Sequence, residues 1–207
     1  MAMPDPARAL EDYRARAHGY DRSMGWLERY RRMAVGLLGL RPGEQVVDAG
    51  CGTGLSLPVL KKAIGPSGRI SGVEQSPEML ELARCRVAEA GWTNVTLTLA
   101  PVQEATLPPG LDAALFCFTH DVVRTPEAVA NVMASLRRGA RFVSIGAREW
   151  HPMFGPINFV ARNAIKQSIT TFEGLHRPWS HLEAYASDLR VRFLFFRWIY
   201  LAAGRLP

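Results

Sequence analysis

Residues 45–56, QVVDAGCGTGLS, decide the fold of this chain. The two valines at 46 and 47 are β-branched and apolar, as a buried strand of a parallel sheet requires. Gly50, Gly52 and Gly54 then follow at alternate positions. Glycine reaches backbone angles that are closed to other residues and leaves no Cβ between the main chain and a ligand. The helix expected after this loop points its free N–H groups at the same place, which suits a negatively charged ligand group. Strand, loop and helix start together predict one ligand-binding edge.

A second strand is expected at residues 70–73, and it ends on Glu74, twenty residues after Gly54. An acid at the end of this strand can accept hydrogen bonds from both hydroxyls of a ribose. The spacing Gly-x-Gly-x-Gly, with Asp48 two residues before the first glycine, differs from the dinucleotide fingerprint Gly-x-Gly-x-x-Gly. A nicotinamide- or flavin-binding Rossmann domain is nevertheless an alternative.

The two segments VVDAGCGTGLS and GVEQSPEML resemble the first two motifs of the class I S-adenosylmethionine-dependent methyltransferases. The resemblance covers residues 41–147, and 187–205 in outline, and points to the small bacterial enzymes that modify quinones, phospholipids and other small molecules. It implies an α/β fold, with a Rossmann-like, doubly wound, mostly parallel seven-stranded sheet that ends in a reversed C-terminal β-hairpin. Two strand-like runs at 189–195 and 198–203 are placed for such a hairpin.

The resemblance also implies the cofactor, S-adenosyl-L-methionine, and the residues that hold it. The glycine loop is expected to hold the methionine part, the acid after the second strand the ribose, and later loops the adenine. The expected cofactor-binding residues are Tyr20, Asp48, Gly50, Cys51, Gly52, Gly54, Glu74, Gln75, Met79, Val102, Gln103 and Phe118. Pro101 stands where the family has an acid for the adenine amino group, so that contact must come from Gln103, from Glu104 or from nowhere.

Chemistry is expected where the fourth strand, residues 111–118, ends. The ligand crevice of an open α/β sheet lies beyond the carboxyl ends of its strands, so Phe118, Thr119, His120 and Asp121 emerge beside the methyl group. Methyl transfer needs alignment and exclusion of water, and it needs a base only if the acceptor must first lose a proton. His120 is the candidate for that base. The alternative is that His120 lines the pocket or holds a loop by hydrogen bonds.

The acceptor is expected to lie between the ends of the strands and two helical additions. Asp121 can hold a cationic amine and Arg124 an anionic group, although each can equally cap the helix that begins at Pro126. That helix is expected to run to residue 136 and to be followed by a turn at 137–141. Residues 148–187 are rich in aromatic residues and proline. They are expected to form an insertion around a helix at about 157–171, which shapes the acceptor site or only packs on itself. The expected substrate-binding residues are Thr119, His120, Asp121, Arg124, Trp150 and His151, and no metal site is expected.

Residues 1–40 are expected to form a helical cap, with helices at 7–17 and 24–40. The second helix places Trp26, Tyr30, Met33 or Ala34, and Leu37 on one stripe at helical spacing. Seven arginines crowd the first 32 residues of a chain whose net charge is +6: Arg8, Arg14, Arg16, Arg22, Arg29, Arg31 and Arg32. A solvated helical face explains them most simply, and a membrane surface or a phosphate-bearing substrate are the alternatives. No nucleic-acid-binding motif is present in the sequence, so no nucleic acid is expected.

The chain has 207 residues, of which 48% are hydrophobic, and this fits a single domain. Its expected parts are a helical cap (1–40), a cofactor-binding core (41–147), an acceptor-site insertion (148–187) and a C-terminal hairpin (188–207). No apolar run of about 18 residues and no secretion signal is present, so a cytoplasmic location is expected. Cys51, Cys85 and Cys117 have no paired or metal-like spacing, which indicates reduced thiols.

The function expected from these features is transfer of a methyl group from S-adenosylmethionine to a small, fairly apolar metabolite. One alternative is N-methylation of an amine phospholipid headgroup, with peripheral membrane contact through the basic N-terminal helices. Another is binding of S-adenosylmethionine without methyl transfer. The acceptor, the methylated atom and the oligomeric state stay open at this point.

Overall fold

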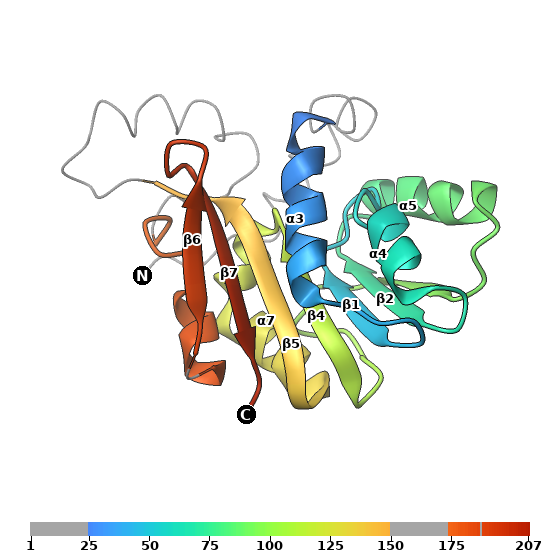
Figure 1. Cartoon of the computed structure of the whole chain (residues 1–207). Helices are drawn as coiled ribbons and strands as arrows, with labels where there is room; N and C mark the ends of the chain where they lie inside the picture. The colour runs from blue at the N-terminus through green and yellow to red at the C-terminus, as the bar shows by residue number, and fades with distance from the viewer. Residues whose placement is uncertain (1–24, 150–173, 187) are drawn as a thin grey trace.

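The computed structural model describes residues 25–149, 174–186 and 188–207, and its centre is a seven-stranded sheet (Figure 1). The strands are β1 (Gln45–Ala49), β2 (Arg69–Glu74), β3 (Val95–Leu99), β4 (Leu111–Cys117), β5 (Leu136–Ala147), β6 (Arg190–Leu194) and β7 (Ile199–Arg205). Their order is β3-β2-β1-β4-β5-β7-β6. Strands β1 to β5 run parallel, and β7 is antiparallel to both β5 and β6. The expected mostly parallel sheet with a reversed C-terminal hairpin is confirmed.

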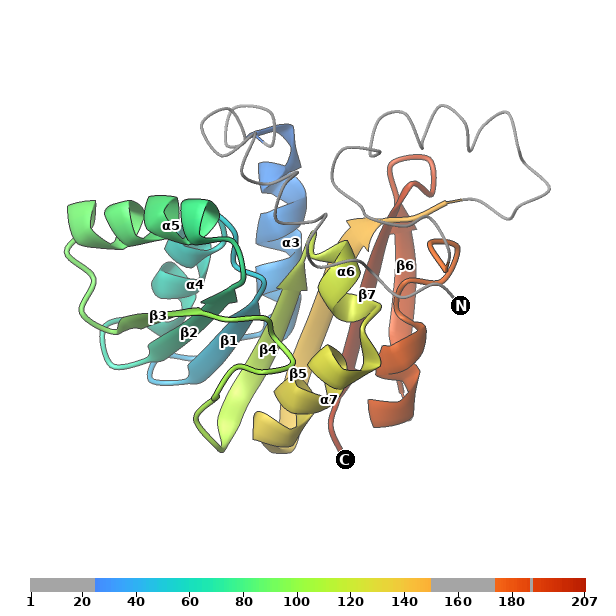
Figure 2. The same ribbon diagram turned by 180° about the vertical axis from the view of Figure 1, so that it is seen from behind.

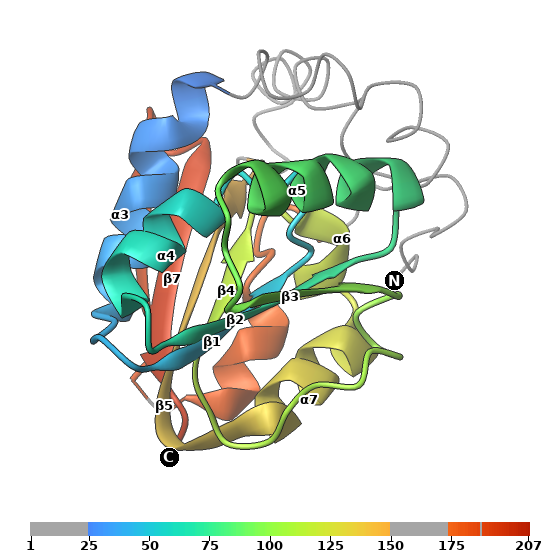
Figure 3. The same ribbon diagram turned by 90° about the vertical axis from the view of Figure 1, so that its right-hand side faces the viewer.

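Helices cover both faces of the sheet (Figures 2 and 3). They are η1 (Gly25–Leu27), α3 (Glu28–Leu38), α4 (Leu57–Ile64) and α5 (Pro77–Glu89) on one face, and α6 (His120–Val123), α7 (Pro126–Ser135) and η3 (Ser180–Tyr185) on the other. Because successive side chains of a strand point to opposite faces, Val46 joins the core under α3 and α4 while Val47 joins the core under α7. The sheet is therefore buried on both sides, as its continuous apolar strands predict.

Helix α3 lies on the sheet with a different face from the one expected. Tyr30 and Ala34 are buried, but Trp26, Met33 and Leu37 are 55%, 43% and 46% exposed, so the expected stripe is wrong for these three. The buried side chains of α3 are Tyr30, Arg31, Ala34, Val35 and Leu38. The helix is rotated so that a stripe holding an arginine faces the strands, and an apolar stripe faces outward.

The start of β5 also differs from the expectation of a helix up to residue 136 and a turn at 137–141. Strand β5 already begins at Leu136, which pairs with Leu111, and the next pair is Ala113 with Arg141. The residues between these pairs form a bulge, in which Gly139 takes a positive φ of 73°. The glycine expected to make a turn therefore makes a bulge within the strand.

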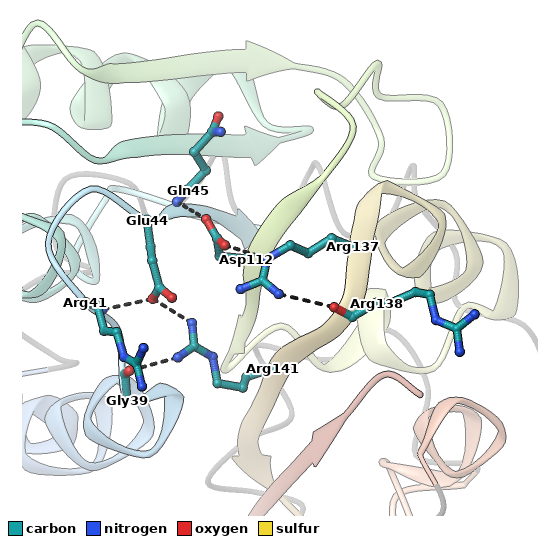
Figure 4. Close-up of polar contacts among 8 residues, drawn as sticks. All are labelled: Gly39, Arg41, Glu44, Gln45, Asp112, Arg137, Arg138 and Arg141. Carbon is teal, nitrogen blue, oxygen red and sulfur yellow. Dashed lines mark hydrogen bonds and ion pairs between the residues drawn. The ribbon is translucent and has the colours of Figure 1, made fainter.

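A network of polar contacts locks the amino edge of the sheet (Figure 4). Arg141 Nη2 lies 2.6 Å from Glu44 Oε2, and its Nη1 donates to the backbone carbonyl that ends α3. Asp112 accepts from the Gln45 backbone N–H at 2.8 Å and from Arg137 Nε at 2.7 Å. Burial alone would raise the pKa of Asp112, but these two hydrogen bonds and the nearby arginine charges lower it. The network fixes α3, β1, β4 and β5 to one another.

The β6–β7 hairpin turns through residues 195–198, two residues more than expected. Phe195, Phe196 and Arg197 all have positive φ, at 46°, 51° and 68°. No helix in the part of the chain that the structure describes is long and apolar enough to cross a bilayer. The helices expected at 7–17 and 157–171 lie outside the described residues, as do Tyr20, Trp150 and His151.

Candidate functional site

The loop after β1 folds back over the end of β2. The backbone N–H groups of Gly50 and Cys51 both donate to Val73 O, each at 2.9 Å. Gly50, Gly52 and Gly54 have φ of 77°, 56° and 81°, so all three use the left-handed region that the glycine pattern predicts. The loop is therefore a compact turn anchored on the neighbouring strand.

The three glycines have different reasons to lack a side chain. A Cβ on Gly50 would lie 2.5 Å from Thr119 Cγ2, and one on Gly54 would lie 2.8 Å from Leu57 Cδ1. A Cβ on Gly52 would meet nothing within 4 Å. The outer glycines thus permit close packing, whereas Gly52 leaves open space above the bare main chain where a ligand can lie.

Glu74 braces this loop from the end of β2. Its Oε2 accepts from the Gly52 backbone N–H and its Oε1 from the Ser76 backbone N–H, both at 2.9 Å. Burial raises the pKa of Glu74, and the backbone hydrogen bonds oppose that rise only in part. A carboxylate has about four lone-pair sites, so Glu74 keeps acceptor capacity for ribose hydroxyls.

Asp48 lies at the carboxyl end of β1 and is 1% exposed. Neither of its carboxylate oxygens has a hydrogen-bond partner among the described residues. Burial, and after it the charge of Glu74, raises the pKa of Asp48 to about 7, although Arg31 acts in the opposite direction. A buried carboxylate without a donor is costly. The ammonium group of the methionine part of S-adenosylmethionine is a donor and a cation, so the site fits this cofactor.

Arg31 reaches the same edge from α3, and the sequence interpretation of a solvated arginine face is wrong for it. It is 5% exposed, and its Nη1 lies 3.0 Å from Glu28 Oε2. Its charge lowers the pKa of both Asp48 and Cys117. Burial has the larger effect on Cys117 and raises its pKa to about 12. The signal that could have found Arg31 was its helical spacing from the buried Ala34, three residues on.

The segment after β3 is held by a residue that the sequence did not single out. Asn131 Nδ2 on α7 donates to Val102 O at 2.7 Å and to Ala105 O at 2.9 Å. Val102 and Met79, both expected near the adenine, are buried, while Gln75 and Gln103 are half-buried. Asn131 was visible in the sequence as the single amide side chain within a mostly apolar helix.

The end of β4 carries a backbone outlier beside the glycine loop. Phe118 has a φ of 59°, and its N–H donates to Ile145 O at 2.7 Å. Such a conformation of a bulky residue costs about 1–3 kcal/mol and occurs preferentially at ligand sites. The next residue, Thr119, has a buried Oγ1 with no hydrogen-bond partner among the described residues.

His120 joins the ends of β4 and β5. Its Nε2 accepts from the Ala147 backbone N–H at 2.7 Å, so the proton of the neutral ring is on Nδ1. Burial, and after it the charge of Arg124, lowers the pKa of His120 to about 4. Its lone pair is thus already used by a backbone donor, which favours the loop-holding interpretation and argues against a base.

The two charged candidates beyond His120 are placed differently. Asp121 lies within α6 and is half-buried, and Arg124 follows the end of α6 and is buried. The position before α7 is filled by Thr125, whose Oγ1 donates to Asp121 O at 2.8 Å. Neither charged side chain therefore occupies the capping position of α7.

Comparison with known proteins agrees with this geometry. A family model described as a methyltransferase domain matches residues 46–139. A demethylmenaquinone methyltransferase from Symbiobacterium thermophilum is 31% identical over 129 residues, which are 60% of this chain and 51% of that protein. An uncharacterized 37.1 kDa protein in transposon TN4556 from Streptomyces fradiae is 33% identical over 126 residues, 58% of this chain and 35% of that protein. The chain thus spans from about a third to about a half of these relatives.

Solved structures show the same fold. Geranyl diphosphate C-methyltransferase from Streptomyces coelicolor matches with a TM-score of 0.73 at 17% identity, over 86% of this chain and 76% of that one. The matched family segment begins in β1 and ends in β5, so it contains the glycine loop, both buried acids and the end of β4. Residues 46–139 thus match a methyltransferase domain, and the described sheet has the fold of solved methyltransferases.

Proposed function

We propose that the chain transfers a methyl group from S-adenosylmethionine to a small, fairly apolar acceptor. The observation that carries the proposal is the buried Asp48 carboxylate, which has no hydrogen-bond donor among the described residues and lies under a loop braced by Glu74. A structural acid in this position would be paired, as Asp112 is at the other edge. An unpaired acid is explained by a cationic ligand.

Each part of the cofactor has residues of matching chemistry in this proposal. Asp48 holds the ammonium group, the open main chain at Gly52 lies against the methionine part, and Glu74 accepts from the ribose hydroxyls. Met79 and the segment at Val102 line the adenine. When bound, S-adenosylmethionine supplies a methyl group on a cationic sulfur, which an aligned nucleophile can displace.

The chain's own residues then align the acceptor and exclude water. Phe118, held in its strained conformation by Ile145, flanks the methyl group. His120 positions this region by linking it to Ala147 and stays neutral above about pH 4. No proton transfer is assigned to it, which suits an acceptor that needs no base.

The names of the relatives support a small-molecule acceptor. One relative is a demethylmenaquinone methyltransferase, and another is a geranyl diphosphate C-methyltransferase. Thr119, Asp121 and Arg124 are the described residues proposed to contact it. Trp150 and His151, within the proposed insertion at 148–187, lie outside the described residues. The single-domain organisation and the cytoplasmic location stay predictions.

The first test is the thermal unfolding of the protein with S-adenosylmethionine, S-adenosylhomocysteine and NAD. Binding to the native state must raise the transition temperature. We expect a rise with the first two that Asp48→Asn and Glu74→Gln reduce and that Asp112→Asn, a matched change at the amino edge, leaves intact. A rise with NAD alone would refute the proposal.

Transfer itself is tested by following S-adenosylhomocysteine with a panel of acceptors. Demethylated quinones, prenyl diphosphates and phosphatidylethanolamine vesicles cover the apolar acceptors and the alternative lipid headgroup. Product with a quinone or prenyl acceptor supports the proposal, and product only with the vesicles supports headgroup methylation. Cofactor binding with no product from any acceptor or from cell extract would favour a protein that binds without transfer.

A further inference from the structure

An apolar band runs along the outer side of α3 to the tip of the β6–β7 hairpin. It consists of Trp26, Met33 and Leu37 on and before α3, and of Phe195 and Phe196 at the tip, where Phe196 is 83% exposed. The ring centroids of Trp26 and Phe195 are 5.8 Å apart, and those of Phe195 and Phe196 are also 5.8 Å apart. These ring contacts join the segment before α3 to the turn.

Arginines border this band on the same face of the sheet. Arg190 and Arg192 of β6 pair with Ala203 and Leu201 of β7, whose side chains belong to the core under α3. Because paired residues point to the same side, both arginines stand on the face that carries α3. Both are exposed, and neither has an ion-pair partner among the described residues. Arg197 at the hairpin tip does not join them, because its guanidinium lies over the ring of Phe193, which packs into the core on the other face.

The hairpin displays its phenylalanines at a conformational cost. Residues 195–197 have positive φ although none of them is glycine, asparagine or aspartate, the types that this conformation favours. Folding alone would be served better by such residues and by a polar tip. Exposed aromatic rings on a strained turn indicate that something outside the described chain contacts them.

We propose that this surface docks on an anionic lipid bilayer. Aromatic rings and short aliphatic side chains enter the headgroup region, where tryptophan and phenylalanine bind well, and the arginines pair with lipid phosphates. A symmetric contact with a second copy centred on β6 would bring its arginines against like charges. A nucleic acid would match the arginines and the rings but would give Met33 and Leu37 nothing to bury against.

The docked surface adjoins the edge that carries the cofactor loop. Strand β6 runs in the same direction as β5, because both are antiparallel to β7, so the hairpin tip lies at the carboxyl edge of the sheet (Figure 1). Docking through the hairpin tip would therefore bring this edge toward the bilayer, in which an apolar acceptor dissolves. This last consequence rests on the proposed methyl transfer, whereas the docking itself does not.

The test is sedimentation of the full chain with vesicles of phosphatidylcholine, with and without phosphatidylglycerol. We expect binding only to the anionic vesicles, and weaker binding as salt is raised. Arg190→Gln with Arg192→Gln should weaken it roughly 30-fold, and Phe196→Ser with Trp26→Ser about tenfold or more. The controls make comparable changes elsewhere on the surface: Lys62→Gln with Arg69→Gln removes two positive charges, and Leu99→Ser removes an apolar side chain that is 48% exposed. They should bind like the parent protein.

The proposal would be overturned by no binding to anionic vesicles at low salt, by equal loss in variants and controls, or by a dimer in light scattering that Phe196→Ser dissociates. Preferential binding of RNA through the same arginines would assign the surface to another partner. Thermal shift with S-adenosylmethionine, measured without vesicles, is kept by every variant that folds. A lost shift in the parent protein would instead overturn the proposed function.

Discussion

At the amino edge of the sheet the Asp112 carboxylate accepts from a backbone N–H and an arginine, and its pKa is lowered. At the carboxyl edge the Asp48 carboxylate has no donor among the described residues, and its pKa is raised to about 7. Both are aspartates on neighbouring parallel strands of one sheet. The carboxyl edge can also satisfy a carboxylate, because Glu74 there accepts from two backbone N–H groups. The difference indicates that one edge serves stability, while the other is kept ready for a ligand.

The sharpest test of this comparison is Asp48→Asn. Losing a charged partner for the ammonium should weaken S-adenosylmethionine binding by about 2–3 kcal/mol, or roughly 100-fold. The unfolding free energy of the protein without cofactor should rise by about 1 kcal/mol, because a buried unpaired charge is removed. Calorimetric titration and denaturant unfolding measure the two effects. A variant that is both less stable and unchanged in affinity would make Asp48 an ordinary structural acid.

The pH dependence of cofactor binding should follow the ionisation of Asp48. The pKa of Asp48 is about 7 in the folded protein instead of the ordinary 3.8. The neutral carboxyl therefore contributes to folding stability fully below about pH 4, and this contribution is lost as the pH rises through 7. Cofactor binding needs the ionised form, so the affinity should rise about tenfold per unit between pH 5 and 7, where the ligand's ammonium stays charged. Titrations across this range check it. A flat profile in the parent protein would contradict the assignment, and Asp48→Asn supplies the flat control.

At the amino edge, Asp112→Asn should act in the opposite direction. It weakens the contact with Arg137 and should lower the unfolding free energy by about 1–2 kcal/mol without changing cofactor affinity. Because its folded pKa is lowered, the stabilisation is present above the unfolded pKa and is lost as the pH falls through the folded value. Denaturant unfolding between pH 3 and 7 measures this. A loss of cofactor affinity in this variant would show that the two edges are coupled.

The smallest effect is expected at His120. Glutamine can accept from the Ala147 backbone N–H, so His120→Gln should reduce kcat by less than tenfold and leave the shape of its pH profile unchanged. A general base contributes about 10²–10⁴-fold, so a loss of that size would restore the base that the sequence first suggested. The measurement is the rate of S-adenosylhomocysteine formation with an acceptor identified in the panel.

The sequence predicted the parts of the molecule that local chemistry determines. Alternating glycines can take positive φ wherever they occur, and a β-branched pair before them is sufficient to expect a buried strand, so the loop and the first two strands were predictable. Glu74 was predictable because its distance from Gly54 is set by one helix and one strand.

Features that depend on packing were not predictable. The rotation of α3 against the sheet decides that Arg31 is buried and Trp26 exposed, and both residue types are compatible with the opposite arrangement. The positive φ of Phe118 is imposed by the strand beside it, and the contact of Asn131 spans 29 residues. Each of these arises from neighbours that are distant in the sequence.

The hydrogen bond from Gly52 to Glu74 has a consequence for how the cofactor arrives. The loop is already folded before binding, because a side chain of the protein holds the amide that bends it. Little chain entropy is then lost on association, and the heat-capacity change of binding should be no larger than burial of the ligand's own apolar surface requires. The cofactor therefore binds to a preformed loop between turnovers. The rate of cofactor exchange is limited by diffusion and desolvation instead of by folding of the loop.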